Sequence, residues 1–246
     1  MDICVIIPTY NNQQTLAQTI DAVLKYTSSV IVVNDGATDA TDEILAQYQS
    51  QINIVSYSPN KGKGYALNRG FDKAETLGYS YAITMDSDGQ HLPEDLPLFF
   101  ETIVKNPGAM IIGSRSFKQK NMPEKNTFAN KFSNFWFTVQ TGIILPDTQT
   151  GFRLYPLKKM NGMRSFTSRY EAELELLVRS AWKNIQLIPI SIQVYYPEKS
   201  ERVTHFRPGI DFFRISLLNT LFVFVAIVYG YPSRFIRILL SKIKKR

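Results

Sequence analysis

The sequence is poor in cysteine, because Cys4 is the single one among 246 residues. One thiol can form neither an internal disulfide nor a thiolate zinc site, so the fold needs no oxidising compartment and we expect a cytosolic protein. Glycine and proline are also scarce, at 13 and 12 residues, whereas 44% of the residues are hydrophobic. This composition excludes collagen-like and disordered chains and predicts one large domain with a packed core.

The body of the chain has almost no net charge. The net charge is +7, and the six basic residues from Arg234 to the C-terminus account for six of these charges. A near-neutral body with a basic end argues against a nucleic-acid groove and favours an anionic membrane surface. The start of the chain has only a short apolar run, residues 3–7, without a basic segment before it, so no secretory signal is expected.

Apolar, β-branched runs alternate with helix-period segments in the first half of the chain. The runs cover residues 3–7, 30–33, 52–57, 81–85 and 109–112. This alternation predicts an α/β fold with a mostly parallel sheet, and the helices between the runs include residues 16–24, residues 66–77 and one that starts near Pro93. In such sheets ligands bind beyond the carboxyl ends of the strands, so the loops that follow the runs are the expected site.

The second half of the chain is less regular. We expect helices over residues 126–144 and 171–182 and a strand over residues 186–196. We assign residues 1–208 to a catalytic domain and residues 209–246 to a membrane-associating end.

That end has two parts. Residues 215–233 carry no charge and are borderline for a membrane crossing, which needs about 20 apolar residues. In residues 234–246 apolar and basic side chains gather on opposite faces of a helix, which is typical of a helix in the membrane interface. A pair of packing or oligomerisation helices is the alternative.

Two carboxylates follow the run at residues 81–85. Asp86 and Asp88 stand two positions apart, with Gln90 close behind. Mg²⁺ and Mn²⁺ take carboxylate and phosphate oxygens, and two such acids can share one ion. An ordinary acidic turn has the same letters, but the position after a buried strand favours a metal site.

Other loops after the runs also hold polar residues. Asp35 follows the second run, where its carboxylate could hold a nucleotide base or ribose, although a plain turn uses the same residues. Tyr10 follows the first run and could stack on a base. Residues 61–70 contain glycines that let the backbone approach a ligand, with Lys63 as a phosphate contact, but they match neither the dinucleotide nor the P-loop pattern.

Six short segments occur in a fixed order along the chain. They are residues 8–11 (PTYN), 33–36 (VNDG), 60–64 (NKGKG), 86–91 (DSDGQH), 113–115 (GSR) and 149–153 (QTGFR). Together they resemble the landmarks of family-2 glycosyltransferases of the GT-A fold, in the branch of dolichol-phosphate mannose synthase and the bacterial polyprenyl-phosphate glycosyltransferases. The resemblance covers roughly residues 3–207, and it departs from the family pattern at Asn12, where Glu is common, and at Asn34, where Asp is common.

The resemblance implies a role for each matching residue. The implied assignments are Asp86, Asp88 and Gln90 for Mg²⁺ or Mn²⁺; Pro8, Tyr10, Asn12, Asp35, Lys63 and Asp86 for the nucleotide sugar; and Gln149, Arg115 and Arg153 for phosphate or acceptor, with Asp88, Arg115 and Arg153 as catalytic candidates. The metal would neutralise the nucleoside diphosphate as it leaves the sugar carbon. The family also implies inversion at that carbon.

The acceptor decides whether the reaction needs a base. A lipid phosphate is already an anion near neutral pH, whereas a hydroxyl needs a carboxylate to take its proton. The candidate bases are Asp147, Glu171 and Glu173. Ser168 stands three residues before Glu171, which predicts a capping box and a structural role for Glu171. Glu173 is therefore the better functional candidate, although a solvated helix acid is an equal alternative.

A basic segment ends the body of the chain. Arg202 and Arg207 are assigned to donor or acceptor phosphates, because arginine binds phosphate through two parallel hydrogen bonds. His205 is a weaker candidate for a metal or phosphate contact. A basic linker before a membrane segment would look the same.

These features predict an inverting glycosyltransferase that moves a hexose from a GDP- or UDP-sugar to a lipid-linked acceptor. Polyprenyl phosphate is the favoured acceptor. The enzyme would act at the cytoplasmic face of the cell membrane, as a peripheral or monotopic protein that binds no nucleic acid. Transfer to a hydroxyl of a glycan or glycolipid, in cell-surface polysaccharide synthesis, is the enzymatic alternative. A nucleotidyltransferase and a non-catalytic membrane adaptor are alternatives of other classes, and the former lacks its usual glycine-rich loop after the first run.

Overall fold

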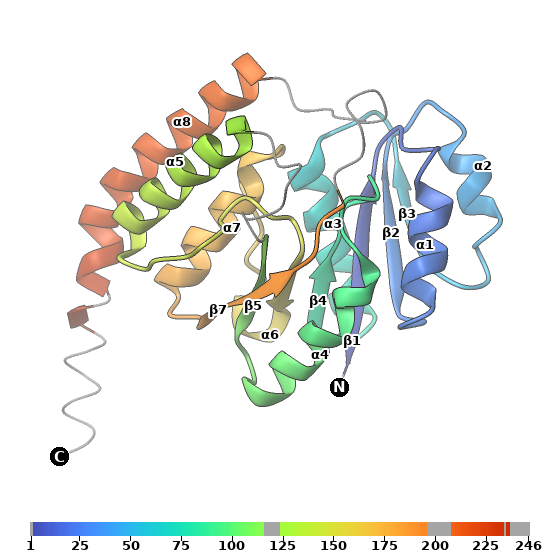
Figure 1. Ribbon diagram of the computed structural model, residues 1–246, viewed down its shortest axis with the longest axis horizontal. Helices are drawn as coiled ribbons and strands as arrows, with labels where there is room; N and C mark the ends of the chain where they lie inside the picture. Colours follow the sequence, from blue (N-terminus) through green and yellow to red (C-terminus); the bar gives the residue numbers. More distant parts are fainter. Residues whose placement is uncertain (1, 116–123, 196–207, 234, 237–246) are drawn as a thin grey trace.

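The computed structural model describes residues 2–115, 124–195, 208–233 and 235–236 (Figure 1). Seven strands form one sheet in the order β3-β2-β1-β4-β6-β5-β7. Their bounds are β1 Ile3–Thr9, β2 Val30–Asp35, β3 Asn53–Tyr57, β4 Tyr81–Thr84, β5 Met110–Arg115, β6 Arg153–Pro156 and β7 Leu187–Ile192. All neighbouring strands are parallel except β6, which runs antiparallel to both β4 and β5. The expected α/β fold with a mostly parallel sheet is confirmed.

Helices cover both faces of the sheet. Their bounds are α1 Leu16–Leu24, α2 Thr41–Ala46, α3 Lys63–Thr76, α4 Leu96–Lys105, α5 Glu124–Thr141, α6 Leu157–Met160, α7 Glu171–Trp182 and α8 Pro208–Val225, with a short 3-10 turn, η1, at Pro93–Asp95 and a π-helical turn, η2, at Ala226–Gly230. The alternating side chains of β1 divide the core. Val5 and Ile7 pack with α1, α2 and α4 on one face, whereas Cys4 and Ile6 pack with α3 and α7 on the other.

The five expected strands of the first half are all present, as β1 to β5. The strand expected at residues 186–196 is present as the shorter β7, and the helix expected at 126–144 is present as α5, which begins and ends earlier. β6 was not expected. The glycine-rich segment that starts at residue 61 is not a loop throughout, because α3 already begins at Lys63.

Helix α3 can begin there because its glycines let two segments approach closely. A Cβ on Gly64 would overlap Ala172 of α7 and the Thr167 carbonyl. The N–H groups of Gly64 and Tyr65 instead donate to the Ser168 carbonyl at 2.8 and 3.2 Å. This contact brings the segment before α7 to the edge of the sheet that holds the site.

Helix α8 packs on the body of the protein along one side and lies beside α5 (Figure 1). Its inner face contributes Leu218 and Phe222 to the core, and the Phe222 ring lies 5.3 Å from that of Trp182 in α7. Residues Gly209–Ser233 form a helix long and apolar enough to cross a membrane, with mean hydropathy 2.0. Of the amphipathic helix expected at residues 234–246, all but residues 235 and 236 lie outside the described chain.

Candidate functional site

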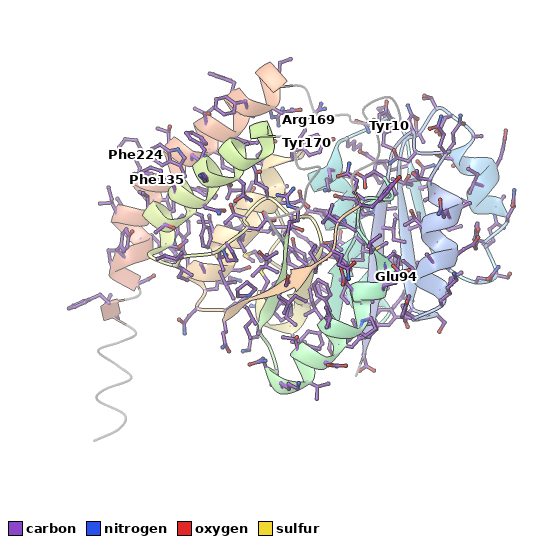
Figure 2. All side chains as sticks on the ribbon, viewed as in Figure 1. Tyr10, Glu94, Phe135, Arg169, Tyr170 and Phe224 are labelled. Carbon is purple, nitrogen blue, oxygen red and sulfur yellow. The ribbon has the colours of Figure 1, made fainter. Side chains whose placement is uncertain are left out.

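A pocket lies at the carboxyl ends of β1, β2 and β4, where the fold class places ligands. Its lining residues are Pro8, Thr9, Tyr10, Asn12, Asp35, Asn60, Gly62, Lys63, Ala66, Asp86, Ser87, Asp88, Gln90, Arg169 and Tyr170. Figure 2 shows Tyr10, Arg169 and Tyr170 together at this end of the molecule, whereas Glu94 lies well away from it. The structure therefore brings together all the residues expected for metal and nucleotide-sugar binding.

Three charged side chains converge beneath the pocket. The Lys63 Nζ lies 2.6 Å from Asp86 Oδ1 and 3.1 Å from Glu173 Oε1. They meet directly over Gly151, where an added Cβ would lie between 2.8 and 3.0 Å from each of the three. Gly151 thus leaves the space in which one ammonium joins a carboxylate of the β4 loop to a carboxylate of α7.

This arrangement sets the protonation states of the cluster. Burial favours the neutral form of both partners, but the attractions to the neighbouring opposite charges together outweigh it. The pKa of Lys63 is therefore raised by the Asp86 and Glu173 carboxylates, even though burial lowers it. In the same way, burial raises the pKa of Asp86, but Lys63, together with His91 and Arg153, more than offsets this and brings the pKa below its ordinary value. Asp86 is thus an anion at neutral pH.

Asp88 is in a different environment. Its pKa is raised, first by burial and then by the negative charge of Asp86. A carboxylate destabilised in this way is stabilised when a cation arrives, and the pocket supplies hard oxygen donors from Asp86, Asp88 and Gln90. No group of three or more His, Cys, Asp or Glu side chains in the described residues forms a complete metal centre. The residues present therefore fit a divalent ion whose coordination is completed by ligand oxygens.

The turn that carries these carboxylates is held by neighbouring loops. Asn12 donates to Ser87 Oγ at 2.7 Å, and Ser87 Oγ donates to the Pro8 carbonyl at 3.1 Å. Thr15 donates to the Ser87 carbonyl at 2.6 Å. Asn12 therefore ties the first loop to the turn between Asp86 and Asp88.

The Asp35 carboxylate, nearly fully buried, is surrounded by donors from the loop after β3. It accepts hydrogen bonds at 2.8 Å from the N–H of Lys61, the N–H of Gly62 and the Asn60 side chain. These bonds fix the loop that leads into α3 and so fix Lys63. Asp35 also lines the pocket, and its contact with a nucleotide stays a prediction.

Three of the residues assigned to phosphate or acceptor are not part of the pocket lining. Arg115 Nε and Nη2 donate to the two oxygens of buried Asp147 at 2.6 and 3.0 Å. Arg153 is fully buried and donates to the carbonyls of Thr148 and Glu173 at 2.8 and 2.6 Å. Gln149 is exposed outside the pocket.

Full burial argues against a ligand contact for Arg153, whereas the contact of Arg115 with phosphate stays a prediction. Arg153 holds the backbone of α7 and the loop before β6 in place, because its guanidinium is enclosed by protein and cannot face a ligand. Arg115 is committed to Asp147, which removes Asp147 from the candidate bases. Arg202, His205 and Arg207 lie outside the described residues.

The capping box expected at Glu171 is wrong. The residue before α7 is Tyr170, its side chain makes no capping hydrogen bond to the helix, and Glu171 is 2% exposed. Its Oε1 accepts hydrogen bonds from Arg214 of α8 at 2.8 and 2.5 Å. Glu171 has a structural role, as expected, but its partner belongs to a helix that is distant in sequence.

Sequence reasoning missed two pocket residues, Arg169 and Tyr170. They precede α7, and no motif or strand end singles them out. They reach the pocket through the packing of Gly64 of α3 against the Ser168 carbonyl. A cation and an aromatic side chain in adjacent positions before a helix were the available signal.

Residues 4–160 match the model of the family "Glycosyl transferase family 2", so the chain belongs to this family. The UDP-N-acetylglucosamine–dolichyl-phosphate N-acetylglucosaminyltransferase of Methanococcus voltae is 26% identical, over 88% of this chain and 96% of the relative. The polyprenol monophosphomannose synthase of Mycolicibacterium smegmatis is 28% identical, over 76% of this chain and 75% of the relative.

Solved structures share the fold. Glucosyl-3-phosphoglycerate synthase from Mycobacterium tuberculosis, in complex with Mn²⁺, UDP and glucosyl-3-phosphoglycerate, has a TM-score of 0.64 and 17% identity, over 91% of this chain and 79% of that chain. The resemblance to family-2 glycosyltransferases of the GT-A fold is thereby confirmed, and the chain is a glycosyltransferase.

Proposed function

We propose that this protein transfers a hexose from a nucleotide sugar to a lipid-linked phosphate, with polyprenyl phosphate as the favoured acceptor. The observation that carries the proposal is the pair Asp86 and Asp88 at the end of β4, inside the pocket of a family-2 chain. Relatives that match most of this chain are named for transfer to dolichyl phosphate or for polyprenol monophosphomannose synthesis.

The donor site would be formed by the loops after β1, β2 and β4. Tyr10 and Asp35 would contact the nucleoside, with Pro8 and Asn12 shaping the same wall. Asp86, Asp88 and Gln90 would hold Mg²⁺ or Mn²⁺, which supplies positive charge to the diphosphate that leaves. Support for a divalent ion comes from the raised pKa of Asp88 and from the Mn²⁺ and UDP in the structurally similar synthase.

A phosphate acceptor agrees with the environment of Glu173. An acceptor phosphate attacks as an anion and needs no base. Glu173 already lies 3.1 Å from the Lys63 ammonium, so its carboxylate orients Lys63 and Asp86. We propose that Glu173 acts in this way and that the anomeric carbon is inverted by direct attack of the phosphate oxygen.

The acceptor would reach the protein from a membrane. The outer face of α8 and of the η2 turn that continues it exposes large apolar side chains: Phe213, Leu217, Leu221 and Phe224 in α8, and Ile227 and Val228 in η2. Its inner face is committed to the core through Leu218 and Phe222, so crossing the bilayer would require α8 to leave the body of the protein. We therefore place the protein as a peripheral or monotopic protein at the cytoplasmic face, with the basic C-terminus toward anionic lipid.

A donor panel tests the proposal. The full-length protein is incubated with Mn²⁺, with short-chain polyprenyl phosphate and with GDP- and UDP-linked hexoses in turn, and release of the nucleoside diphosphate is measured. We expect release from one donor class that depends on polyprenyl phosphate and on Mn²⁺ or Mg²⁺. Release that depends on a glycan hydroxyl instead would favour the alternative acceptor, and absence of release from every donor would contradict the proposal.

A further inference from the structure

Arg169 lines the pocket, although neither the motifs nor the family comparison assigns it a role. It precedes α7, and its side chain is 25% exposed. Figure 2 shows it at the same end of the molecule as Tyr10. Its Cγ would lie 3.1 Å from a Cβ on Gly62, so the side chain packs against the loop that Asp35 organises.

The charges around the pocket make this position significant. In the described part of the chain, the lining holds three acids, Asp35, Asp86 and Asp88, and two cations, Lys63 and Arg169. The Lys63 ammonium is shared between Asp86 and Glu173. Arg169 is therefore the lining cation whose charge is not committed to the carboxylates of the metal turn. A nucleoside diphosphate or a lipid phosphate that enters this acidic pocket needs such a cation besides the metal.

The side chain of Arg169 is held from α8. Its Nε lies 3.5 Å from Oδ1 of Asp211, which is fully buried in the first turn of α8. In the described residues Asp211 is the acid within ion-pair distance of Arg169, and the Nε has no hydrogen-bond partner. One contact at this distance leaves most of the five N–H donors of a guanidinium to other acceptors.

A second ion pair also joins the start of α7 to α8, and here the basic residue belongs to α8 and the acidic residue to α7. Arg214 of α8 donates to Glu171 of α7, three residues from Asp211 along α8 and two residues from Arg169 along the chain. Two ion pairs thus hold the start of α8 against the start of α7. The position in which α8 packs on the body of the protein therefore determines where the Arg169 guanidinium lies.

We propose that Arg169 binds phosphate oxygens in the pocket and that Asp211 positions it from α8. The helix whose outer face is apolar therefore also fixes one wall of the active site. This inference rests on the proposed function for the identity of the ligand, which is the diphosphate of the donor or the phosphate of the lipid acceptor. Both ligands present the same oxygen atoms, and a planar guanidinium matches them through paired hydrogen bonds.

The test compares Arg169→Gln and Arg169→Lys with the matched control Arg164→Gln. Arg164 has a similar exposure, 20%, and pairs with Asp72 and Glu75 outside the pocket. Two quantities are measured on the full chain: the dissociation constant of GDP and of UDP with Mn²⁺ by calorimetry, and the KM for short-chain polyprenyl phosphate. Thermal unfolding confirms that each variant is folded.

We expect Arg169→Gln to raise either the dissociation constant of the nucleoside diphosphate or the KM for polyprenyl phosphate by about tenfold or more, as the loss of a charge-assisted hydrogen bond does. Arg169→Lys should recover part of this loss. Weaker binding of the nucleoside diphosphate identifies the donor diphosphate as the ligand of Arg169, and a raised KM alone identifies the lipid phosphate. Folded Arg169→Gln with both quantities unchanged would overturn the proposal and leave Arg169 with a purely structural role.

Asp211→Asn tests the positioning step. It should raise the same constant as Arg169→Gln does. The double variant should bind no more weakly than Arg169→Gln alone, because the effects of substitutions at residues that act as one unit are not additive. Additive effects would contradict positioning by Asp211. The calorimetric measurement needs no turnover, so an Arg169-dependent affinity without sugar transfer rejects the proposed function alone. A wild type that binds neither nucleoside diphosphate nor lipid phosphate rejects both.

Discussion

At the scale of single residues, the site places opposite charges so that each one determines the state of the next. Lys63 contacts Asp86 and Glu173, and the pKa of Asp88 is raised first by burial and then by the charge of Asp86. The two carboxylates of the turn after β4, Asp86 and Asp88, are therefore unequal. Asp86 already contacts an ammonium, whereas among the described residues none lies within ion-pair distance of Asp88, so we expect Asp88 to gain most when a divalent ion binds.

Asp88→Ala should accordingly abolish metal-dependent binding of the nucleoside diphosphate while the protein stays folded, since Asp88 lies on a turn and not in the core. Calorimetry with GDP and UDP, with and without Mn²⁺, measures this directly. Glu94→Ala is the control, because Glu94 is an exposed acid on the following segment and lies outside the pocket (Figure 2). Unchanged Mn²⁺-dependent affinity in folded Asp88→Ala would remove Asp88 from the metal site.

Glu173→Gln distinguishes the two acceptor classes. If the acceptor is a phosphate, the variant should retain most of its turnover, because the amide oxygen still accepts a hydrogen bond from Lys63 and no proton has to be removed. Loss of a general base would lower kcat on the order of 10² to 10⁴-fold. Steady-state kinetics with polyprenyl phosphate decides between these outcomes, and Glu101→Gln on the exposed face of α4 is the control. A loss of that size in folded Glu173→Gln favours a hydroxyl acceptor.

At the scale of the elements, periodicity and strand-end motifs predicted most of the fold. Apolar runs in parallel strands buried on both faces are strong signals, and they located β1 to β5. β6 gave no such signal, because its four residues include Arg153 and Pro156. A buried arginine is stable in this strand only because two carbonyls, from Thr148 and Glu173, meet its guanidinium in the folded protein. Both partners are backbone carbonyls, which every residue carries, so no residue-type pattern reveals them.

The same reason explains which site residues could be predicted. Asp35, Asp86 and Asp88 end strands of a parallel sheet, so topology alone places them together. Arg169 and Tyr170 belong to the segment before α7, and only the close packing of Gly64 brings that segment to the pocket. Arg115 and Arg153 carry the residue type that binds phosphate, but buried protein acceptors occupy them.

The loop between α5 and β6 depends on one buried ion pair. Asp147 is fully buried and accepts hydrogen bonds from Arg115 and from Asn130. Burial raises the pKa of Asp147, but the Arg115 pair and backbone donors outweigh burial and hold it below its ordinary value. Removal of one partner of a buried pair costs about 3–5 kcal/mol. Asp147→Asn should lower the free energy of unfolding by a large part of that amount at pH 7.

The pH dependence of this effect follows from the sign of the shift. A carboxyl with a lowered pKa in the folded state stabilises the protein above its unfolded pKa of about 3.9, and this stability disappears as the pH falls through the folded value. Urea unfolding at several pH values should therefore show the difference between wild type and Asp147→Asn shrinking below about pH 4. Asp72→Asn, which disrupts the more exposed pair with Arg164, should change stability by only about 0–1 kcal/mol. Equal effects of the two substitutions would contradict this assignment.

At the scale of the whole molecule, α8 has two faces with separate tasks. The inner face joins the core through Leu218 and Phe222, and the outer face exposes apolar side chains. The helix lies beside α5 (Figure 1). A large exposed apolar surface marks an interaction site, and the basic residues after it suit an anionic bilayer. These features support the proposed membrane face, and the contact of Arg169 with Asp211 brings the start of α8 beside the pocket.

Replacement of Leu217, Leu221 and Phe224 by Gln should lower binding to anionic vesicles in a flotation assay while thermal stability stays near that of the wild type. Each of these side chains is more than half exposed, so each contributes to lipid contact and little to the core. The control replaces Leu98 and Val104 of α4, which are exposed on another part of the protein. Undiminished flotation of the α8 variant, or an equal loss in the α4 variant, would contradict the assigned membrane face.

The central claim is that the sugar is transferred to the phosphate of a lipid, and the chemical nature of the product tests it most directly. The full-length protein is given the preferred nucleotide sugar, Mn²⁺ and an equimolar mixture of polyprenyl phosphate and the corresponding polyprenol, and the lipid products are identified by mass spectrometry. We predict a single product with the mass of polyprenyl phosphate plus one hexosyl group, absent with Asp88→Ala. A product built on the polyprenol hydroxyl, or a lipid fraction unchanged while the nucleoside diphosphate is released, would contradict the account.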